Sequence, residues 1–461
     1  MSIVGAIMVP HPPLIVPEVG RGGEKVVEET INSYIKAAEF IKDLAPDTIV
    51  LSSPHSTMYA DYLHISPGSH AEGDLGMFGA PQVHFEVDYD EELSSGICSL
   101  AEANLIPAGY EGERDSSLDH GTMVPLYFIR QKYTDFKLVR LAISGISLEE
   151  HYRLGKVIAE AAEILGRRVV YVASGDLSHK LQEDGPYGFD KAGPEYDSKI
   201  MDVMGSGRFG ELLKFDPVLC DDAAECGHRS FVIMAGALDG LSVEASMLSH
   251  QDVTGVGYGI CTYKVTGEDS SRRFLDKAMA ETESEAAVRK ANEDPFVSLA
   301  RLTVETYIKH HTLPEVPDDL PSEMTDRKAG VFVTLHIGES LRGCIGTISP
   351  VRQSITQEIM ANAISACTRD PRFNPVRPDE LPLITYSVDV LGDAEDIDSE
   401  DQLDVKRYGV IVTNGDRRGL LLPDLDGVDT VAEQVAIARS KAGIAQDEPV
   451  SLQRFEVVRH Y

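Results

Sequence analysis

The sequence lacks the features that mark membrane-spanning, disulfide-stabilised and nucleic-acid-binding proteins. None of its 461 residues lies in an uninterrupted apolar stretch approaching the roughly 20 residues of a membrane span. The six cysteines are scattered without a C-x-x-C pair, which argues against structural zinc or disulfides and fits a reducing compartment. Lys and Arg number 42 against 75 Asp and Glu. The resulting net charge of −33 argues against nucleic acid or an anionic membrane as a partner.

The amino terminus also lacks a basic segment before "SIVGAIMVP", so we expect no signal peptide and a cytoplasmic location. An apolar content of 43% and a charged content of 25% are those of a globular protein. A chain of 461 residues is too long for one ordinary core, and we expect two or three domains.

Residues 1–266 are predicted to form an α/β layered domain. Apolar runs predict buried strands at 2–9, 47–53, 167–174 and 255–265. The first two enclose a segment of helical periodicity, a β-α-β unit whose strands should be parallel. Another helix is expected over 149–165, with Ser147 at its start and Gly166 at its end. The fold class is therefore α/β, with a central, mostly parallel or mixed sheet flanked by helices.

Residues 267–289 are polar with a weak helical period, and we interpret them as a linker. Residues 290–461 follow a different rhythm of helices and short strands, which predicts a smaller α+β domain. Within it, "YGVIVTNGDRRGLLLP" is typical of a β-hairpin, because Asn414-Gly415 suits a tight turn.

Three predicted strands of the first domain run into a histidine: His11 in "VPHPP", His55 in "SSPHS" and His179 in "SGDLSH". Ligands of open parallel sheets collect beyond the carboxyl ends of the strands, so these imidazoles are expected to converge. A lone histidine is more often a packed core residue, but three with the same placement favour a site. Asp176, in the last of these motifs, is expected to cap the turn that holds His179. His120 in "LDHGTMVPL" has a similar setting, between a polar loop and an apolar run.

The segment "CDDAAECGH" adds Glu225 and Cys226 just before an apolar helix. Acidic residues also stabilise a helix start through its dipole. Two imidazoles and one carboxylate, however, are the ligand set of non-haem Fe(II) oxygenases.

These motifs, in this order, resemble the catalytic chains of the class III extradiol ring-cleavage dioxygenases and the related Memo proteins. The resemblance covers residues 1 to about 265. It implies His11 and His55 as metal ligands, His179 as the catalytic acid/base and His120 as a catalytic donor to substrate or oxygen.

The third ligand stays open between two neighbours. Ring-cleaving enzymes have a glutamate there, which Glu225 matches and which would favour Fe2+. Memo proteins have a cysteine followed by glycine, which Cys226-Gly227 matches and which would favour copper or zinc. Of the two, we favour Glu225.

In the second domain, "LRGCIGT" is the most distinctive stretch. Cys344 is either a small core residue or a thiolate nucleophile activated by Arg342. With "RDPRFNPV" and "DELPLITYSVDVL", the motif resembles the AMMECR domain. The two halves together resemble the AmmeMemoRadiSam protein A family, which implies a radical S-adenosylmethionine enzyme as a partner.

Two functions follow from these expectations. The first is an Fe2+-dependent oxidoreductase that acts on a catechol-like or other diol-bearing small molecule with O2. The second is a non-catalytic accessory protein that binds a metal or substrate for the radical partner. A zinc hydrolase that uses the same ligands is a third possibility.

Overall fold

The computed structural model describes residues 2–114, 117–337, 340–425 and 427–461. The chain forms two compact units, residues 1–279 and 280–461. The division between them falls inside helix α9 (Phe274–Asn292). The segment 267–289, interpreted above as a linker, completes a strand, forms a short 3₁₀ turn at Ser270–Arg272 and makes up most of this helix.

The first unit is built on a six-stranded mixed sheet of order β7-β2-β8-β1-β10-β9. Its strands are β7 (Lys137–Ala142), β2 (Thr48–Ser53), β8 (Val169–Ser174), β1 (Ile3–Val9), β10 (Tyr258–Glu268) and β9 (Leu241–Gln251). The first four are parallel, and β10 and β9 run antiparallel to their neighbours. The predicted mixed sheet is confirmed.

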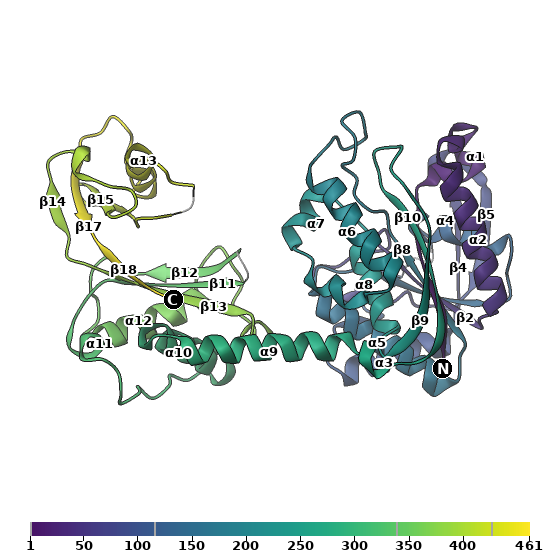
Figure 1. Cartoon of the computed structure of the whole chain (residues 1–461), viewed down its shortest axis with the longest axis horizontal. Helices are drawn as coiled ribbons and strands as arrows, with labels where there is room; N and C mark the ends of the chain where they lie inside the picture. Colours follow the sequence, from purple (N-terminus) through teal and green to yellow (C-terminus); the bar gives the residue numbers. More distant parts are fainter. Residues whose placement is uncertain (1, 115–116, 338–339, 426) are drawn as a thin grey trace. The chain divides into compact units, whose positions relative to one another are not determined.

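Helices cover both faces of this sheet (Figure 1). One face packs on α2 (Glu28–Leu44) and α4 (His120–Arg130), and the other on α3 (Glu91–Ala103), α5 (Leu148–Leu165), α6 (Ala192–Ser206) and α8 (His228–Ala237). Successive residues of β1 alternate between the two cores: Ala6 and Met8 pack on the second face, Ile7 and Val9 on the first. Strands buried on both sides explain the unbroken apolar runs of the sequence.

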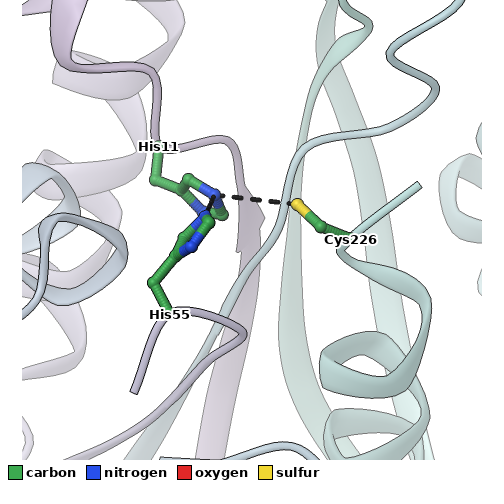
Figure 2. Close-up of side chains that lie close together, drawn as sticks. All are labelled: His11, His55 and Cys226. Atoms are coloured by element: carbon green, nitrogen blue, oxygen red, sulfur yellow. Dashed lines mark hydrogen bonds between the residues drawn. The ribbon is translucent and has the colours of Figure 1, made fainter. Parts of the chain in front are cut away.

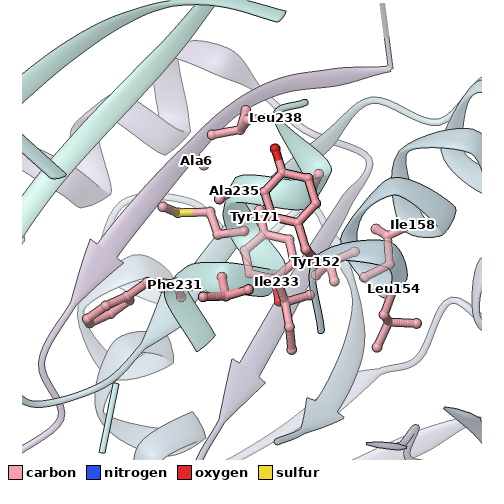
Figure 3. Packing of buried hydrophobic residues seen from close by; sticks show 14 of the residues in the cluster. Ala6, Tyr152, Leu154, Ile158, Tyr171, Phe231, Ile233, Ala235 and Leu238 are labelled. Atoms are coloured by element: carbon pink, nitrogen blue, oxygen red, sulfur yellow. The ribbon is translucent and has the colours of Figure 1, made fainter. Parts of the chain in front are cut away.

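The core between β8 and helices α5 and α8 is dense (Figure 3). Tyr152, Tyr171 and Phe231 are among its fully buried side chains. The two helices approach through glycines, since a Cβ on Gly155 would lie 2.1 Å from the carbonyl oxygen of Ile233. Helix α5 begins as predicted, with the Ser147 hydroxyl accepting from the Glu150 N–H, and ends at Gly166 with φ 64°.

The remaining elements of this unit lie in its connections. They are α1 (Pro17–Gly20), α7 (Pro217–Ala223), β3 (Leu63–His64), β4 (His70–Leu75), β5 (Ala80–Asp88), β6 (Ala108–Gly109) and 3₁₀ turns at Pro13–Ile15, Gly23–Val27, Gly76–Phe78 and Phe209–Lys214.

The second unit has two four-stranded antiparallel sheets, of order β12-β11-β13-β18 and β14-β17-β15-β16. Their strands are β11 (Val331–Ile337), β12 (Ser340–Gly346), β13 (Ile384–Leu391), β14 (Glu395–Ile397), β15 (Gly409–Asn414), β16 (Arg417–Leu421), β17 (Ser451–Phe455) and β18 (Val457–His460). The predicted hairpin is confirmed as β15–β16, with Gly415 at φ 61° in its turn.

Its helices are α10 (Pro295–His310), α11 (Ser322–Asp326), α12 (Ile355–Thr368) and α13 (Val431–Lys441), with 3₁₀ turns at Pro378–Glu380 and Glu400–Gln402. Helices α10 and α12 pack on the first sheet and α13 on the second, which confirms the α+β class. In the described parts of both units, no helix combines the length and apolarity that crossing a bilayer requires.

Candidate metal centre

Three neighbouring strands of the first sheet bring the predicted histidines together. β2, β8 and β1 are adjacent and parallel, so their carboxyl ends meet at one edge. His55 follows β2, His179 follows β8 and His11 follows β1. Residues separated by up to 168 positions of sequence are therefore placed beside each other by the sheet order alone.

His11 is held by a network that fixes its tautomer. The ring is buried, and its Nδ1 lies 2.9 Å from the Ser174 hydroxyl. Ser174 donates its own hydrogen to the Gly121 carbonyl at 2.6 Å, so it accepts from His11 Nδ1–H. The Nε2 lone pair of His11 is thus left to face the neighbouring side chains, as a metal ligand requires.

His55 presents its Nε2 to the same point. The Nε2 atoms of His11 and His55 lie 2.9 Å apart (Figure 2). Two nitrogens at the usual metal distance of about 2.0–2.1 Å from one ion would be separated by about 3 Å. The His120 ring lies 4.0 Å from that of His55, so a third imidazole flanks the pair.

Asp119 supports the loop that carries His55. Its carboxylate accepts from the hydroxyls of Ser53 and Ser56 and from the backbone N–H of Thr122, where it caps α4. Burial alone would raise the pKa of Asp119, but these hydrogen bonds and the positive charge of Arg140 outweigh it, and the pKa is lowered. Asp119, which the sequence analysis does not identify as a site residue, therefore stays charged beside the imidazoles.

The thiol of Cys226 completes the set. Its Sγ lies 3.7 Å from His11 Nε2, and the donor atoms of His11, His55 and Cys226 all lie within 4.8 Å of one another. The carboxylate of Glu225 instead accepts from the backbone N–H of His228 at 2.6 Å, at the start of α8. The structure thus gathers the cysteine, and not the favoured glutamate, with the imidazole pair.

Asp176 and His179 form a second set with the same thiol, again within 4.8 Å. Asp176 is buried and accepts from the His11 backbone N–H at 2.8 Å. The sequence predicts only a turn-capping role for this carboxylate, and its position in "SGDLSH", three residues before His179, is the signal that points to more. His179 donates from Nδ1 to the Ala224 carbonyl at 2.5 Å, which leaves its Nε2 as an acceptor.

The electrostatics of the cluster favour a cation. Burial, aided by the charge of His55, lowers the pKa of His11 to about 3, and burial also lowers the pKa values of His55 and His120. These rings are therefore neutral at pH 7 and able to act as ligands. Burial raises the pKa values of Asp176 and Cys226. A bound cation would lower these two pKa values again, because it stabilises the thiolate and the carboxylate. The donor set fits a transition-metal ion.

The predicted site of the second unit, Arg342 and Cys344, is paired by hydrogen bonds within its own fold. Arg342 pairs with Glu380 through two hydrogen bonds, at 2.7 and 3.0 Å, and also donates to the carbonyl of Asn374. The thiol of Cys344 accepts from the Thr334 hydroxyl at 3.2 Å, and burial raises its pKa. Arg342 thus clamps the 370–380 loop to β12, and the neighbouring thiol stays protonated.

Comparison with family models identifies the family of the first unit. Residues 5–261 match the catalytic LigB subunit of aromatic ring-opening dioxygenase. The chain belongs to the LigB family. Residues 297–460 match the AMMECR1 family, so the predicted fusion of the two kinds of domain is confirmed.

Relatives match either the whole chain or about a third of it. Protein CA_C1420 of Clostridium acetobutylicum is 41% identical over 100% of this chain and 99% of its own length. A Thermotoga maritima protein is 49% identical over 36% of this chain and 98% of its own. The solved structure of PH0010 from Pyrococcus horikoshii is 34% identical and covers 36% of this chain and 88% of its own, with a TM-score of 0.33.

Proposed function

We propose that the LigB unit is a metal-dependent oxidoreductase that oxidises a catechol-like or other diol-bearing small molecule with O2, with Fe2+ as the metal, in the cytoplasm. The observation that carries the proposal is the 2.9 Å approach of two neutral imidazole Nε2 atoms beside the Cys226 thiol. Three protein ligands leave coordination positions open, which a chelating substrate and a second reactant require.

His11, His55 and Cys226 would hold the ion. When bound, the ion supplies positive charge that acidifies a diol hydroxyl and the redox chemistry that O2 needs. Ser174 would keep the His11 Nε2 lone pair available to the ion, and Asp119 would keep the His55 loop in place.

His179 would act as the general base. Because its Nδ1 donates to the Ala224 carbonyl, its Nε2 receives the proton of the substrate hydroxyl and later returns it. His120, the first residue of α4, lies beside His55 and would donate a hydrogen bond that orients the substrate oxygen.

The cysteine supports a second candidate function. A thiolate is a softer ligand than a carboxylate and suits copper or zinc. An accessory protein that binds such a metal, or a substrate, for a radical S-adenosylmethionine enzyme would need these ligands but no oxygen chemistry. The AMMECR1 unit would then serve the partner, and this chain itself has no C-x-x-x-C-x-x-C cluster motif.

The test is elemental analysis of protein purified without oxygen, followed by oxygen uptake with catechol. We expect near-stoichiometric iron that is lost in His55→Ala and Cys226→Ser but retained in Glu225→Gln, and oxygen uptake that His179→Ala abolishes without loss of iron. Copper or zinc dependent on Cys226, with no oxygen uptake, would favour the accessory function. A protein that binds no metal after reconstitution would refute the oxidoreductase and the metal-binding form of the accessory function.

A further inference from the structure

The strand pairing of the AMMECR1 unit leaves part of β13 open on one side. β11 pairs with β13 from Ile384 to Val390, whereas β18 pairs with it only from Val388 to Leu391. Among the residues of this unit that the structure describes, no strand pairs with 384–387 on the β18 side. The open stretch 384–387 therefore continues the line of β18 past His460.

The backbone groups of two residues point toward this open side. The Gly392 N–H donates to the Glu456 carbonyl at 2.8 Å, on the β18 side of the strand. Successive residues of a strand point their N–H and C=O groups to opposite sides, and β13 has no break in its register with β11. Counted back in twos from Gly392, the N–H and C=O groups of Ile384 and Tyr386 face the open side.

The sequence of the open stretch favours pairing with a further strand. Exposed strand edges are commonly protected by charged side chains or proline. The outer strands of the second sheet are protected in this way, with Glu395 and Asp396 on β14 and Arg417 and Arg418 on β16. The open stretch reads Ile-Thr-Tyr-Ser, without a charge or a proline.

A groove of about 870 Å³ lies along this edge. It is lined by all four residues of 384–387, by Val288 of α9, by Val297 of α10 and by Tyr461. Val288 is 60% exposed and Tyr461 is 74% exposed, so apolar surface faces solvent beside the open backbone. An apolar groove next to an unpaired strand edge is the kind of site that takes up an extended polypeptide.

The last pair of β18 indicates which side chains an added strand needs. His460 lies opposite Val388, and its ring stacks on Phe296 of α10 with the ring centroids 3.8 Å apart. Side chains alternate with a period of two, so residues opposite Tyr386 and Ile384 would lie on this same, helix-covered face. The residues between them would point to the other face of the sheet.

We propose that this groove binds an extended segment of a partner protein as an added strand, in line with β18 and with apolar side chains at every second position. A polypeptide strand is the ligand that offers N–H and C=O groups at the spacing of those of Ile384 and Tyr386. The proposal concerns the AMMECR1 unit and does not depend on the metal centre.

The test uses the full-length protein and a fluorescein-labelled peptide of three valine–threonine pairs between Gly-Ser ends, followed by fluorescence anisotropy. With the valines on the helix-covered face, the valine N–H groups meet β13 and the threonine N–H groups point outward. We therefore expect N-methylation of the valines to weaken binding by about 10-fold or more, and N-methylation of the threonines to change it by less than about threefold.

Two variants locate the peptide. Val288→Asp should weaken its binding about 3- to 10-fold, because a charge replaces part of the apolar wall. Val458→Asp is the matched control, since Val458 is 57% exposed in the same unit and does not line the groove, and its affinity should stay native. Residue-resolved hydrogen exchange should show the Tyr386 amide exchanging faster than the Ser387 amide in the free protein, and slowed when the peptide binds.

Other results would overturn the proposal. These are a native protein that does not bind the peptide, equal losses on methylation of the valines and of the threonines, and equal losses in the two variants. A Tyr386 amide as protected as that of Ser387 in the free monomer would mean that the edge is already covered. A Tyr386 amide protected by dimerisation, with no effect of the peptide, would assign the edge to a second copy of this chain instead of a partner.

Discussion

The LigB unit and the AMMECR1 unit each carry a distinctive polar motif. The two motifs differ in how far hydrogen bonds within the fold occupy their polar groups. In the LigB unit, hydrogen bonds to Ser174 and to the Ala224 carbonyl occupy one nitrogen of His11 and of His179 and leave the other nitrogen facing its neighbours. In the AMMECR1 unit, Arg342 is matched by Glu380 and loop carbonyls. A polar motif thus indicates a chemical role when free lone pairs converge on one point, and a structural role when its hydrogen-bonding groups are paired within the fold.

The largest expected effect tests the support of the metal centre. Asp119→Asn should weaken metal binding about 10- to 100-fold, because an amide cannot accept from Ser53, Ser56 and Thr122 at once. Competition with a chelator measures it. Asp90→Asn is the matched control, since Asp90 caps α3 and accepts from Thr48 and Arg167 in the same unit. Equal losses in both variants would mean general destabilisation.

The next effect tests the clamp of the AMMECR1 unit. Arg342→Ala should lower the free energy of unfolding of this unit by about 2 kcal/mol, because Glu380 and the loop carbonyls lose a charged donor. This free energy is measured by urea denaturation, with hydrogen exchange on peptides of the AMMECR1 unit as the readout of its unfolding. Arg327→Ala, which removes the exposed partner of Glu323 in the same unit, should cost less than about 1 kcal/mol. Unchanged stability in Arg342→Ala would restore an active role for this arginine.

A smaller effect tests the tautomer of His11. Ser174→Ala should weaken metal binding about tenfold, because the imidazole can then carry its hydrogen on Nε2 and turn a ligand into a donor. The measurement is again chelator competition. Ser230→Ala provides the comparison, since this hydroxyl is buried and donates to the Ser52 carbonyl rather than to a proposed ligand. Similar values for the two variants would contradict the assignment.

The smallest effect concerns Cys344. Cys344→Ser should change the stability of the AMMECR1 unit by less than about 1 kcal/mol, since a hydroxyl can still pair with Thr334. Burial raises the pKa of Cys344 above the ordinary 9.0, so the reactive thiolate is scarce at neutral pH and increases with pH. Its alkylation by iodoacetamide, followed by mass spectrometry, should still accelerate as the pH rises through 9.0. A plateau near pH 7 would reveal an activated nucleophile.

Much of the fold and part of the site could be predicted from the sequence. The apolar run before His11 and its equivalents before His55 and His179 reveal buried strands that lead into a histidine, because hydrophobic periodicity is a local property of the sequence. The order β2-β8-β1, which makes them neighbours, is a tertiary property that the runs do not encode.

The rest depended on contacts distant in the sequence or on single backbone angles. Ala224 takes a left-handed conformation, with φ 53°, at the end of α7, and the turn that follows decides whether Glu225 or Cys226 meets the imidazoles. The role of Asp176 rests on the His11 backbone 165 positions away. Arg342 similarly pairs with Glu380, 38 positions away. The sequence suggests a different partner, because Cys344 lies only two positions from Arg342.

The separation of His11 and Cys226 by 215 positions has a consequence for how the protein is made. During translation the two histidines leave the ribosome early, yet the thiol that completes their set follows almost at the end of the LigB unit. The nascent chain therefore cannot form the three-ligand site until α7 and the turn after it have been synthesised and the central strands have assembled. Under the proposed function, metal loading would therefore be a late step of biosynthesis, and a chain that ends before Cys226 would lack one of the three proposed ligands.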